Sequence, residues 1–417
     1  MSAGTKPSEA GRPAMEEGPA EPVFSGPEGI RFDFNYGCRV QVPVSGWRVK
    51  MVDTDTFTVL FNEHVDANSV IASMRKYYVR FLVEVFDGAR RVFSHTFDPA
   101  GKQIRLRMPP WALGDTVAWL PAIDAFRDKH RCEVHVPMGE HLQVLYQEVY
   151  PHLQLATEAQ LAKQNVTYYA TYYFGWITPF FERDHQPTDP RISSMQDTVA
   201  YQLGVSPGER KPPLRVADTE RQVAERYVCI ATQASRQRKY WNNPDGWPVL
   251  IDYLKSLGYR VLCIDRYWQY GDDEFTNTMP QGAEDFTGDR SLQDRVDMLF
   301  HADFFIGLGS GLSWLAWALD VPVVMINGFT HPLTEFHTPY RVINFHVCNS
   351  CLNDTGIEFI PDDFGRCPRL EDSPKRFQCT ASITPQFVMQ VVDRLIRDQS
   401  RARVASAIDC DESVSQI

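Results

Sequence analysis

Hydrophobic and polar positions follow three successive patterns along the chain. Residues 28–107 contain short runs of β-branched and aromatic residues separated by turn-forming residues, which predicts a module of antiparallel strands. Residues 108–215 alternate between amphipathic helical segments and apolar strands, which predicts an α/β domain. Residues 216–395 repeat strand and helix with nearly continuous apolar strands, which is typical of a parallel sheet covered on both faces. With right-handed crossovers, this last region is predicted to be Rossmann-like.

Two terminal segments fall outside this pattern, and a third segment spans the boundary between its last two regions. Residues 1–27 are rich in Pro, Gly, Ala, Ser and Glu, so they are predicted to form a disordered tail. Residues 206–222 carry three prolines between 207 and 213 and are predicted to link two domains. Residues 396–417 are predicted to be a C-terminal tail.

Composition narrows the class of protein and its compartment. The chain has 417 residues, 43% of them hydrophobic and 23% charged, which is ordinary for a globular protein. A net charge of −11 argues against a general nucleic-acid binder. No apolar run reaches the roughly 18–20 residues that span a bilayer, and the first residues lack the features of a signal peptide. We therefore expect a cytoplasmic protein with reduced thiols, in which clustered cysteines are metal ligands rather than disulfides.

The turn GLGSGLSW, residues 307–314, joins a predicted buried strand to a predicted helix. Its glycines allow a ligand to approach the backbone closely, and backbone N–H groups at a helix start favour phosphate. The groups expected to point outward are the N–H groups of Ser310, Gly311, Leu312 and Ser313, after Gly309. A tight turn with no ligand is the alternative, because the spacing matches neither a Walker A loop nor GxGxxG.

Two more loops leave the ends of strands in the same predicted sheet. Ligands of open α/β sheets gather at the carboxyl ends of strands, so these loops can share a ligand with the glycine turn. The segment 231–242 offers three cations and three hydrogen-bonding side chains: Arg236, Arg238, Lys239, Thr232, Gln233 and Ser235. The third strand end carries Asp265 and Arg266. An acidic residue there can bind a ribose hydroxyl, although a turn-forming role is the alternative for Asp265.

A further candidate lies in the segment MPPWALGDTVAWLPA, residues 108–122. Asp115 follows a glycine at the start of a predicted helix, which fits an ordinary N-cap. Trp111 and Trp119 lie nearby, and aromatic faces commonly line sugar sites.

Four of the nine cysteines fall within residues 346–380, here called the cysteine finger. Cys348 and Cys351 form a CxxC pair, fifteen residues separate Cys351 from Cys367, and eleven more precede Cys379. The segment has few apolar residues, so a four-thiolate metal centre would stabilise it. This ligand set suits zinc or iron, and a closed site of this kind is structural. The other five are predicted to be small buried hydrophobic residues: Cys38, Cys132, Cys229, Cys263 and Cys410.

From about residue 28 onward, the chain resembles the bacterial autotransporter heptosyltransferases, the TibC-like family. The segment GSGLSWLAWALDVPVV, residues 309–324, is similar to the donor-domain pattern of the related lipopolysaccharide heptosyltransferases, and the cysteine finger is similar to that of the autotransporter branch. The resemblance implies a GT-B glycosyltransferase: an N-terminal β module, two Rossmann-like domains (108–215 and 216–395) and the finger. The phosphate turn departs from the Asp-Thr-Gly of the lipopolysaccharide enzymes, because this chain has Gly309-Ser310-Gly311.

The resemblance also implies an activity and its residues. The donor would be ADP-heptose and the acceptors serines of an autotransporter passenger, with inversion in a single displacement. Asp115 matches the general base, and Lys239 matches the lysine that neutralises the donor phosphates. The segment 231–242, which contains Lys239, is therefore called the donor loop below. The 310–313 turn would stabilise the leaving diphosphate. No catalytic divalent cation is expected. The finger would bind one iron, and subunits would assemble into a large ring, up to a dodecamer, with the β module in contacts.

Two other functions fit the same residues. One is a glycosyltransferase of this fold with a different nucleotide sugar or a lipopolysaccharide acceptor. The other is a metal-stapled scaffold without turnover, which the joint presence of Asp115, Lys239 and the glycine turn disfavours.

The finger provides a first test. Cys351→Ser removes one of four thiolates, so we predict that the variant loses its metal and its soluble assembly together. Metal analysis and size-exclusion chromatography would measure both. A metal-free variant that is fully assembled and active would contradict a structural role for the finger.

Overall fold

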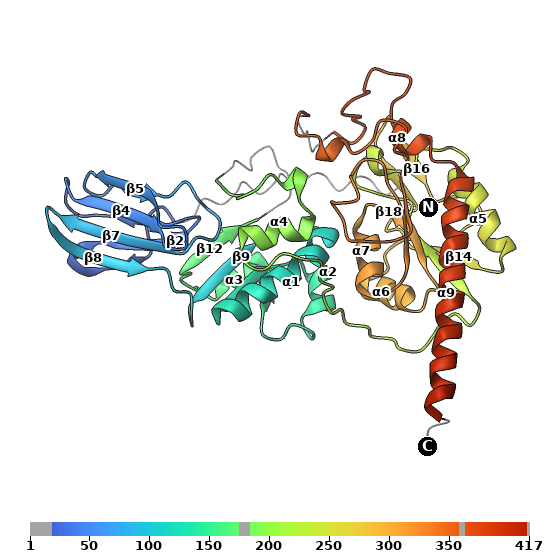
Figure 1. The fold of residues 1–417 in the computed structure, drawn as a ribbon, viewed down its shortest axis with the longest axis horizontal. Helices are drawn as coiled ribbons and strands as arrows, with labels where there is room; N and C mark the ends of the chain where they lie inside the picture. The colour runs from blue at the N-terminus through green and yellow to red at the C-terminus, as the bar shows by residue number, and fades with distance from the viewer. Residues whose placement is uncertain (1–18, 175–183, 358–362, 415–417) are drawn as a thin grey trace. The chain divides into compact units, whose positions relative to one another are not determined.

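The computed structural model describes residues 19–174, 184–357 and 363–414. The chain divides into two compact units, Met1–Arg215 and Val216–Ile417, and each is described by itself (Figure 1). The last two residues of the predicted strand at 169–176 lie outside the described residues.

The first unit begins with the β-rich region that the sequence predicts. One sheet is antiparallel throughout and has the order β5-β4-β7-β8 (Figure 1). Its strands are Arg48–Asp53 (β4), Thr58–His64 (β5), Phe81–Asp87 (β7) and Arg90–Thr96 (β8). Burial alternates along β4, where Val49 and Met51 are fully buried, as expected for a strand with one face on a core.

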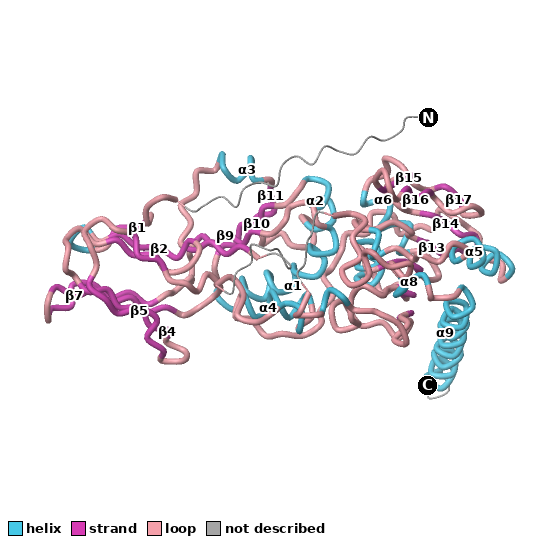
Figure 2. Tube along the Cα trace, turned by 90° about the horizontal axis from the view of Figure 1, so that it is seen from above, coloured by secondary structure: helices cyan, strands magenta, loops and turns pink. Residues whose placement is uncertain are grey.

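The second sheet of this unit joins the β-rich region to the α/β region. Its order is β11-β10-β9-β12-β2-β3-β6, and β1 pairs with β2. The strands are Phe24–Ser25 (β1), Arg31–Asn35 (β2), Arg39–Gln41 (β3), Val70–Ala72 (β6), Gln103–Arg107 (β9), Glu133–Pro137 (β10), Gln154–Ala156 (β11) and Ala170–Tyr173 (β12). The predicted module at 28–107 is therefore wrong in one respect. Its last strand, β9, pairs in parallel with β10 and β12 and so lies inside the sheet. Figure 2 shows β9 beside β10.

Helices pack on this sheet, and the described chain before it begins at Pro19. The helices of the unit are Pro27–Gly29 (η1), Leu113–His130 (α1), Glu140–Tyr146 (α2), Glu158–Lys163 (α3), Pro190–Ile192 (η2) and Met195–Gln202 (α4). α1 packs against α4. The prediction of disorder at 1–27 is wrong for residues 19–27, because the Phe24 ring contacts those of Phe32 and Tyr169 and Arg39 donates to the Pro19 carbonyl.

The second unit contains the predicted Rossmann-like sheet. Six parallel strands have the order β17-β14-β13-β18-β19-β20. They are Tyr227–Ile230 (β13), Arg260–Cys263 (β14), Glu284–Asp285 (β17), Phe305–Leu308 (β18), Val323–Ile326 (β19) and Arg341–Val342 (β20). All residues of β13, β18 and β19 are buried, which confirms a sheet covered on both faces. A separate hairpin is formed by Gln269–Gly271 (β15) and Thr276–Thr278 (β16).

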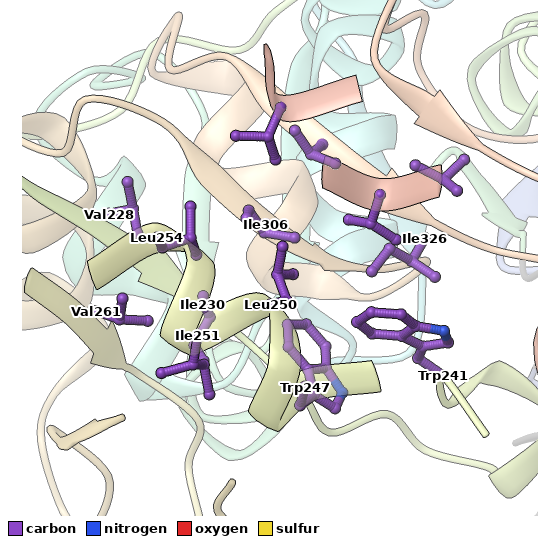
Figure 3. Packing of buried hydrophobic residues seen from close by; sticks show 14 of the residues in the cluster. Val228, Ile230, Trp241, Trp247, Leu250, Ile251, Leu254, Val261, Ile306 and Ile326 are labelled. Carbon is purple, nitrogen blue, oxygen red and sulfur yellow. The ribbon is translucent and has the colours of Figure 1, made fainter. Parts of the chain in front are cut away.

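The helices of this unit pack on a continuous apolar core. They are Gln237–Lys239 (η3), Gly246–Ser256 (α5), Leu292–Phe300 (α6), Gly311–Ala318 (α7), Cys351–Asn353 (η4), Gln378–Ala381 (α8) and Pro385–Val414 (α9). Figure 3 shows side chains of α5 against those of the strands, among them Leu250, Ile251, Val228 and Ile306. Beside them, the rings of Trp241 and Trp247 meet edge to face at 5.2 Å.

The C-terminal tail predicted at 396–417 is instead part of α9. The helix runs from Pro385 to Val414 and lies beside α5 (Figure 1). Leu395 is fully buried, and Gln399 Nε2 donates to the Asp303 carbonyl at 2.7 Å. Apolar and polar contacts thus continue past the predicted end of the domain. In the described part of the chain, no helix is both long enough and apolar enough to cross a membrane.

The predicted burial of the isolated cysteines is confirmed where their side chains are described. Cys38, Cys132, Cys229 and Cys263 are buried and form no disulfide. Cys410 lies outside the described side chains.

His130, the last residue of α1, makes the stability of the first unit depend on pH. Its ring lies 5.0 Å from the Tyr78 ring and 4.5 Å from the Phe126 ring. Burial, with the charge of Lys129 as a smaller cause, lowers the pKa of His130 from 6.5 to about 4. The unfolded chain therefore takes up a proton that the folded chain does not, so this contribution to stability is lost as pH falls from about 6.5 toward 4.

We predict that His130→Phe removes this loss. Its free energy of unfolding, relative to wild type, should rise as pH falls through that window, and urea unfolding at a series of pH values would measure it. The same substitution at the exposed His64 is the matched control. An equal pH dependence in both variants would contradict the assignment to His130.

Candidate functional site

The candidate donor site lies at the carboxyl ends of three neighbouring strands. β13 pairs in parallel with β14 on one side and with β18 on the other, with Ile230 opposite both Cys263 and Ile306. The donor loop, Asp265 with Arg266, and the glycine turn follow these three strands directly. The structure therefore places the three predicted segments at one edge of the sheet, where ligands of open α/β sheets bind.

Asp265 holds the donor loop. Its side chain is 2% exposed, and one carboxylate oxygen accepts from Thr232 N–H at 2.7 Å and Thr232 Oγ1 at 2.9 Å. The other oxygen accepts from Gln233 N–H at 3.2 Å. Burial raises the pKa of Asp265, although the bonds from Thr232 and Gln233 oppose the shift. The turn-forming alternative therefore describes Asp265 better than contact with a ribose. The Thr232 side chain likewise bonds to Asp265 within the protein.

The remaining predicted polar residues differ in exposure. Ser235 and Arg266 are exposed, and the Arg266 guanidinium lies 5.2 Å from the centre of the Tyr267 ring. Gln233 Nε2 donates to the Tyr267 carbonyl at 2.7 Å, which ties the donor loop to the chain after β14. The exposed pair can meet a ligand from this edge.

The cations of the donor loop differ in burial. Arg238 is buried over the Phe329 ring, and its Nη1 donates to the carbonyls of Asp363 and Arg366 at 3.4 and 3.3 Å. Burial lowers the pKa of Arg238 to about 10. The expectation that Arg238 binds a ligand is therefore wrong, because its buried guanidinium binds backbone carbonyls of the protein itself. Lys239 ends η3 and is half-buried.

The glycine turn presents fewer N–H groups than predicted. The Ser310 N–H donates to the Leu308 carbonyl at 2.7 Å, and the Ser313 N–H donates to the Ser310 carbonyl at 3.1 Å. Ser313 is buried, and its Oγ donates to the Leu308 carbonyl at 2.5 Å. Within the described chain, no backbone hydrogen bond uses the N–H of Gly311 or Leu312. These two groups begin α7 and are the ones placed to receive an anion.

A buried polar cluster, which sequence reasoning missed, lies behind Gly309. A Cβ at Gly309 would come within 2.7 Å of Asn327 Nδ2 and 2.8 Å of Glu335 Oε1. Glu335 Oε1 accepts from Asn327 at 2.9 Å and from Thr330 at 2.6 Å, and Glu335 Oε2 pairs with Arg341 at 3.1 Å. Only glycine fits at 309 without displacing this cluster. The available signal was the polar run that follows an apolar strand at Ile326.

Three of the four finger cysteines, Cys351, Cys367 and Cys379, are buried, and Cys348 is half-buried. Burial raises the pKa of Cys351 to about 12, with the Cys348 charge as the next cause. Burial also raises the pKa of Cys379 to about 12, followed by the charges of Cys367 and Cys348. Among the described residues, however, no group of three or more His, Cys, Asp or Glu side chains is arranged to hold an ion. The donor set fits a thiophilic ion by its chemistry and burial, while the predicted tetrahedral arrangement is not assembled.

The finger contacts the donor loop through backbone and aromatic groups. The Gln237 N–H donates to the Phe364 carbonyl at 2.9 Å, and the Phe364 ring lies 6.2 Å from the Tyr240 ring. Asn242 Nδ2 donates to Thr380 Oγ1 at 2.9 Å. The position of the donor loop therefore depends on the finger.

The finger also contacts the loop that follows β19. The Ser350 N–H donates to the Gly328 carbonyl at 2.8 Å, and the Leu352 N–H donates to the Phe329 carbonyl at 3.2 Å. At Gly328 a Cβ would lie 2.7 Å from the Cys379 carbonyl oxygen, so the two chains approach closely here. The finger thus connects two loops at the same edge of the sheet.

In the first unit, Asp115 lies where β9 passes into α1. α1 begins at Leu113 after the N-cap Ala112, so Asp115 is in its first turn and the N-cap interpretation is wrong. Asp115 is half-buried. Trp111 is 56% exposed beside it, whereas Trp119 is fully buried, with Nε1 donating to the Met195 carbonyl at 3.1 Å. Only Trp111 is therefore available to a ligand, and Trp119 is a core residue.

We predict that Asp265→Asn loosens the donor loop. An amide offers one acceptor oxygen and one NH₂ group, so an N–H of Thr232 or Gln233 loses its buried partner at a cost of about 1–3 kcal/mol. Hydrogen exchange at these two amides should accelerate and the melting temperature should fall. Asp289→Asn, at an exposed site, is the control. Unchanged exchange at Thr232 and Gln233 would contradict this role.

Comparison with known proteins shows where this chain belongs. Residues 26–89 match the family described as glycosyltransferase TibC, N-terminal domain, and residues 170–355 match glycosyltransferase family 9 (heptosyltransferase). The chain is 41% identical over 397 residues to the autotransporter heptosyltransferase TibC of Escherichia coli, covering 94% of this chain and 95% of TibC. It is 38% identical over 371 residues to BimC of Burkholderia thailandensis, described as an inactive autotransporter heptosyltransferase, covering 89% of this chain and 87% of BimC.

A solved structure gives the same relationship. It is described as dodecameric iron-containing heptosyltransferase TibC in complex with ADP-D-β-D-heptose. The TM-score is 0.87 at 41% identity, and the match covers 92% of this chain and 99% of that one. Similarity along nearly the whole length of both chains leads to one conclusion: the chain belongs to the autotransporter heptosyltransferase family.

Proposed function

We propose that this chain transfers heptose from ADP-heptose to serine hydroxyls of an autotransporter passenger protein, in a single displacement that inverts the anomeric centre. The observation that carries the proposal is the edge formed by β14, β13 and β18, where Lys239 and the start of α7 follow neighbouring strand ends. Support comes from TibC, a relative of similar length whose solved structure contains ADP-D-β-D-heptose.

In this proposal the donor diphosphate binds at that edge. The Lys239 ammonium pairs with its oxygens, and the N–H groups of Gly311 and Leu312 donate to it at the positive end of α7. Charge on the diphosphate grows as the glycosidic bond breaks, so these fixed groups stabilise the transition state more than the bound donor. The exposed Ser235 and Arg266 bind the nucleoside side of the donor, while Asp265 acts through Thr232 and Gln233 as a positioning residue.

Asp115 is proposed as the general base. It takes the proton of the serine hydroxyl as that oxygen forms a bond to the anomeric carbon. The bond from that carbon to the phosphate oxygen breaks at the same time, and ADP leaves with its electron pair. Attack opposite the leaving group inverts the centre. A base of this kind contributes about 10²–10⁴-fold to the rate.

The finger is proposed to hold one structural iron through Cys348, Cys351, Cys367 and Cys379. Zinc fits the same ligand set, and the description of TibC as iron-containing favours iron. When bound, the ion would link the parts of the finger, as structural four-thiolate sites do. The chain's own contacts from Phe364 to Gln237 and from Ser350 to Gly328 would then hold the loops of the donor site.

Assembly and compartment complete the proposal. TibC is described as dodecameric, and we propose that copies of this chain also form a large ring. We place the protein in the cytoplasm, where reduced thiols suit a thiolate centre.

A non-catalytic scaffold is the second candidate function. The observation that favours it is BimC, a relative of 38% identity described as inactive. Binding of the donor separates the two candidates in part, because a scaffold has no need of a selective nucleotide-sugar site.

We predict that Lys239→Ala weakens the binding of ADP-heptose roughly 10- to 100-fold. The loss of a charge-assisted hydrogen bond costs about 1.5–3 kcal/mol, and each 1.4 kcal/mol is tenfold. Calorimetric titration would measure it, with Lys255→Ala on the exposed side of α5 as the control and GDP- and UDP-sugars as competing donors. Equal affinity in the Lys239 variant would contradict its role. Failure of the metal-replete wild type to bind any nucleotide sugar would favour the scaffold.

A further inference from the structure

One face of the large sheet in the first unit is polar, although sheets with parallel strands are usually apolar on both faces. Along the central strand β9, Ile104 and Leu106 are fully buried on one face. Because side chains alternate, Arg105 and Arg107 lie on the opposite face. The strand register continues this face sideways in a row that crosses four strands: Asn35 of β2, Thr171 of β12, Arg105 of β9 and His135 of β10.

The members of this row are connected by hydrogen bonds. Thr171 Oγ1 donates to Asn35 Oδ1 at 2.6 Å, and Asn35 Nδ2 donates to the Tyr168 carbonyl at 3.1 Å. Tyr168 OH lies 3.3 Å from His135 Nδ1, and the Arg105 guanidinium lies 5.5 Å from the centre of the Tyr168 ring. Asn35, Thr171 and His135 are each at least 96% buried, with exposed fractions of 2%, 4% and 4%.

Two arginines on this face share one carboxylate. Glu158 pairs with Arg105 and accepts from Arg107 Nε at 3.2 Å. Arg107 Nη1 donates to Tyr36 OH at 2.6 Å. Arg105 Nε is buried and has no hydrogen-bond partner among the described residues. A buried donor without a partner costs about 1–3 kcal/mol, so a ligand that accepts from it would recover that cost.

Some of these side chains line a cavity of about 560 Å³ within the first unit: Asn35, Tyr36, Arg105, Glu158, Tyr168 and Thr171. His135 and Arg107 lie behind them and support the lining through Tyr168, Tyr36 and Glu158. The volume lies within the usual range for small-molecule sites. These six residues supply polar groups to the lining, and Leu161 and Ala162 of α3 add apolar surface. Asp115 and Trp111 do not line it, so it is separate from the candidate acceptor site.

The lining selects the chemistry of the ligand. Glu158 and Thr171 can accept hydrogen bonds, Arg105 and Tyr36 can donate them, and the rings of Tyr36 and Tyr168 offer flat apolar surface. Sugar hydroxyls both donate and accept, and the C–H face of a sugar packs on aromatic rings. A phosphate or nucleotide would instead meet the Glu158 carboxylate, and a hydrocarbon would leave the polar row unpaired. We propose that this cavity binds a neutral, polyhydroxylated ligand of the size of a small saccharide.

The proposal stands on the cavity alone and does not require heptosyl transfer. Saturation-transfer NMR on the full chain would test it, with D-mannose and D-glucose as neutral probes, D-glucuronate and inorganic phosphate as anionic probes, and excess ADP to occupy any nucleotide site. Ala162→Phe fills the cavity from α3 without altering the polar row. Ala89→Phe, in the exposed turn between β7 and β8, is the matched control.

We expect a saturation-transfer signal from a neutral sugar with the wild type and with Ala89→Phe. In Ala162→Phe, binding of that sugar should be at least tenfold weaker, at an unchanged melting temperature. Tyr168→Leu removes the aromatic surface and should weaken binding in the same way. The absence of transfer to either neutral sugar would overturn the proposal. A saturation-transfer signal in Ala162→Phe equal to that of the wild type would also overturn it, as would stronger binding of the anionic probes than of the neutral ones.

Discussion

The parallel pairing of β13 with both β14 and β18 is the constraint on which the proposed donor site depends. Because the three strands point the same way and lie side by side, the loops that follow them meet at one edge. Two local features then fix what this edge presents. The buried carboxylate of Asp265 holds Thr232 and Gln233 of the donor loop, and the absence of a side chain at Gly309 lets the glycine turn lie against Asn327 and Glu335.

The finger also contacts the loops at this edge and helps to fix their positions. Its backbone bonds reach Gln237 in the donor loop and Gly328 after β19. Arg238 of the donor loop connects the same three segments. It lies over the Phe329 ring of the loop after β19, and its Nη1 donates to the carbonyls of Asp363 and Arg366 in the finger. A segment with little apolar content of its own thus lies against two loops of the proposed donor site. If the finger binds a metal as proposed, loss of that metal should lower the affinity for the donor.

The sequence predicted what is local and periodic. Apolar runs such as those of β13, β18 and β19 predicted the Rossmann-like sheet correctly. The spacing of four cysteines predicted a metal finger, but the described side chains do not form a group that could hold an ion. The pairing of strands that lie far apart in the chain could not be predicted from the sequence pattern. β9 carries the alternation of an antiparallel strand, yet it pairs in parallel with β12, more than sixty residues later. Side-chain direction was equally hidden: Asp265 and Arg238 have the residue types of ligand-binding groups, but both point inward. The cluster around Glu335 forms only when the loop after β19 folds against Gly309.

The most direct test of the account is intact-mass spectrometry of a purified autotransporter passenger incubated with this chain and ADP-heptose. We predict that the passenger gains the mass of one or more heptosyl units on serine. Asp115→Asn should slow this gain by about 10²–10⁴-fold without lowering the melting temperature of the chain. A passenger that stays unmodified, in the presence of an assembled, metal-replete chain that binds ADP-heptose, would contradict the proposed transfer.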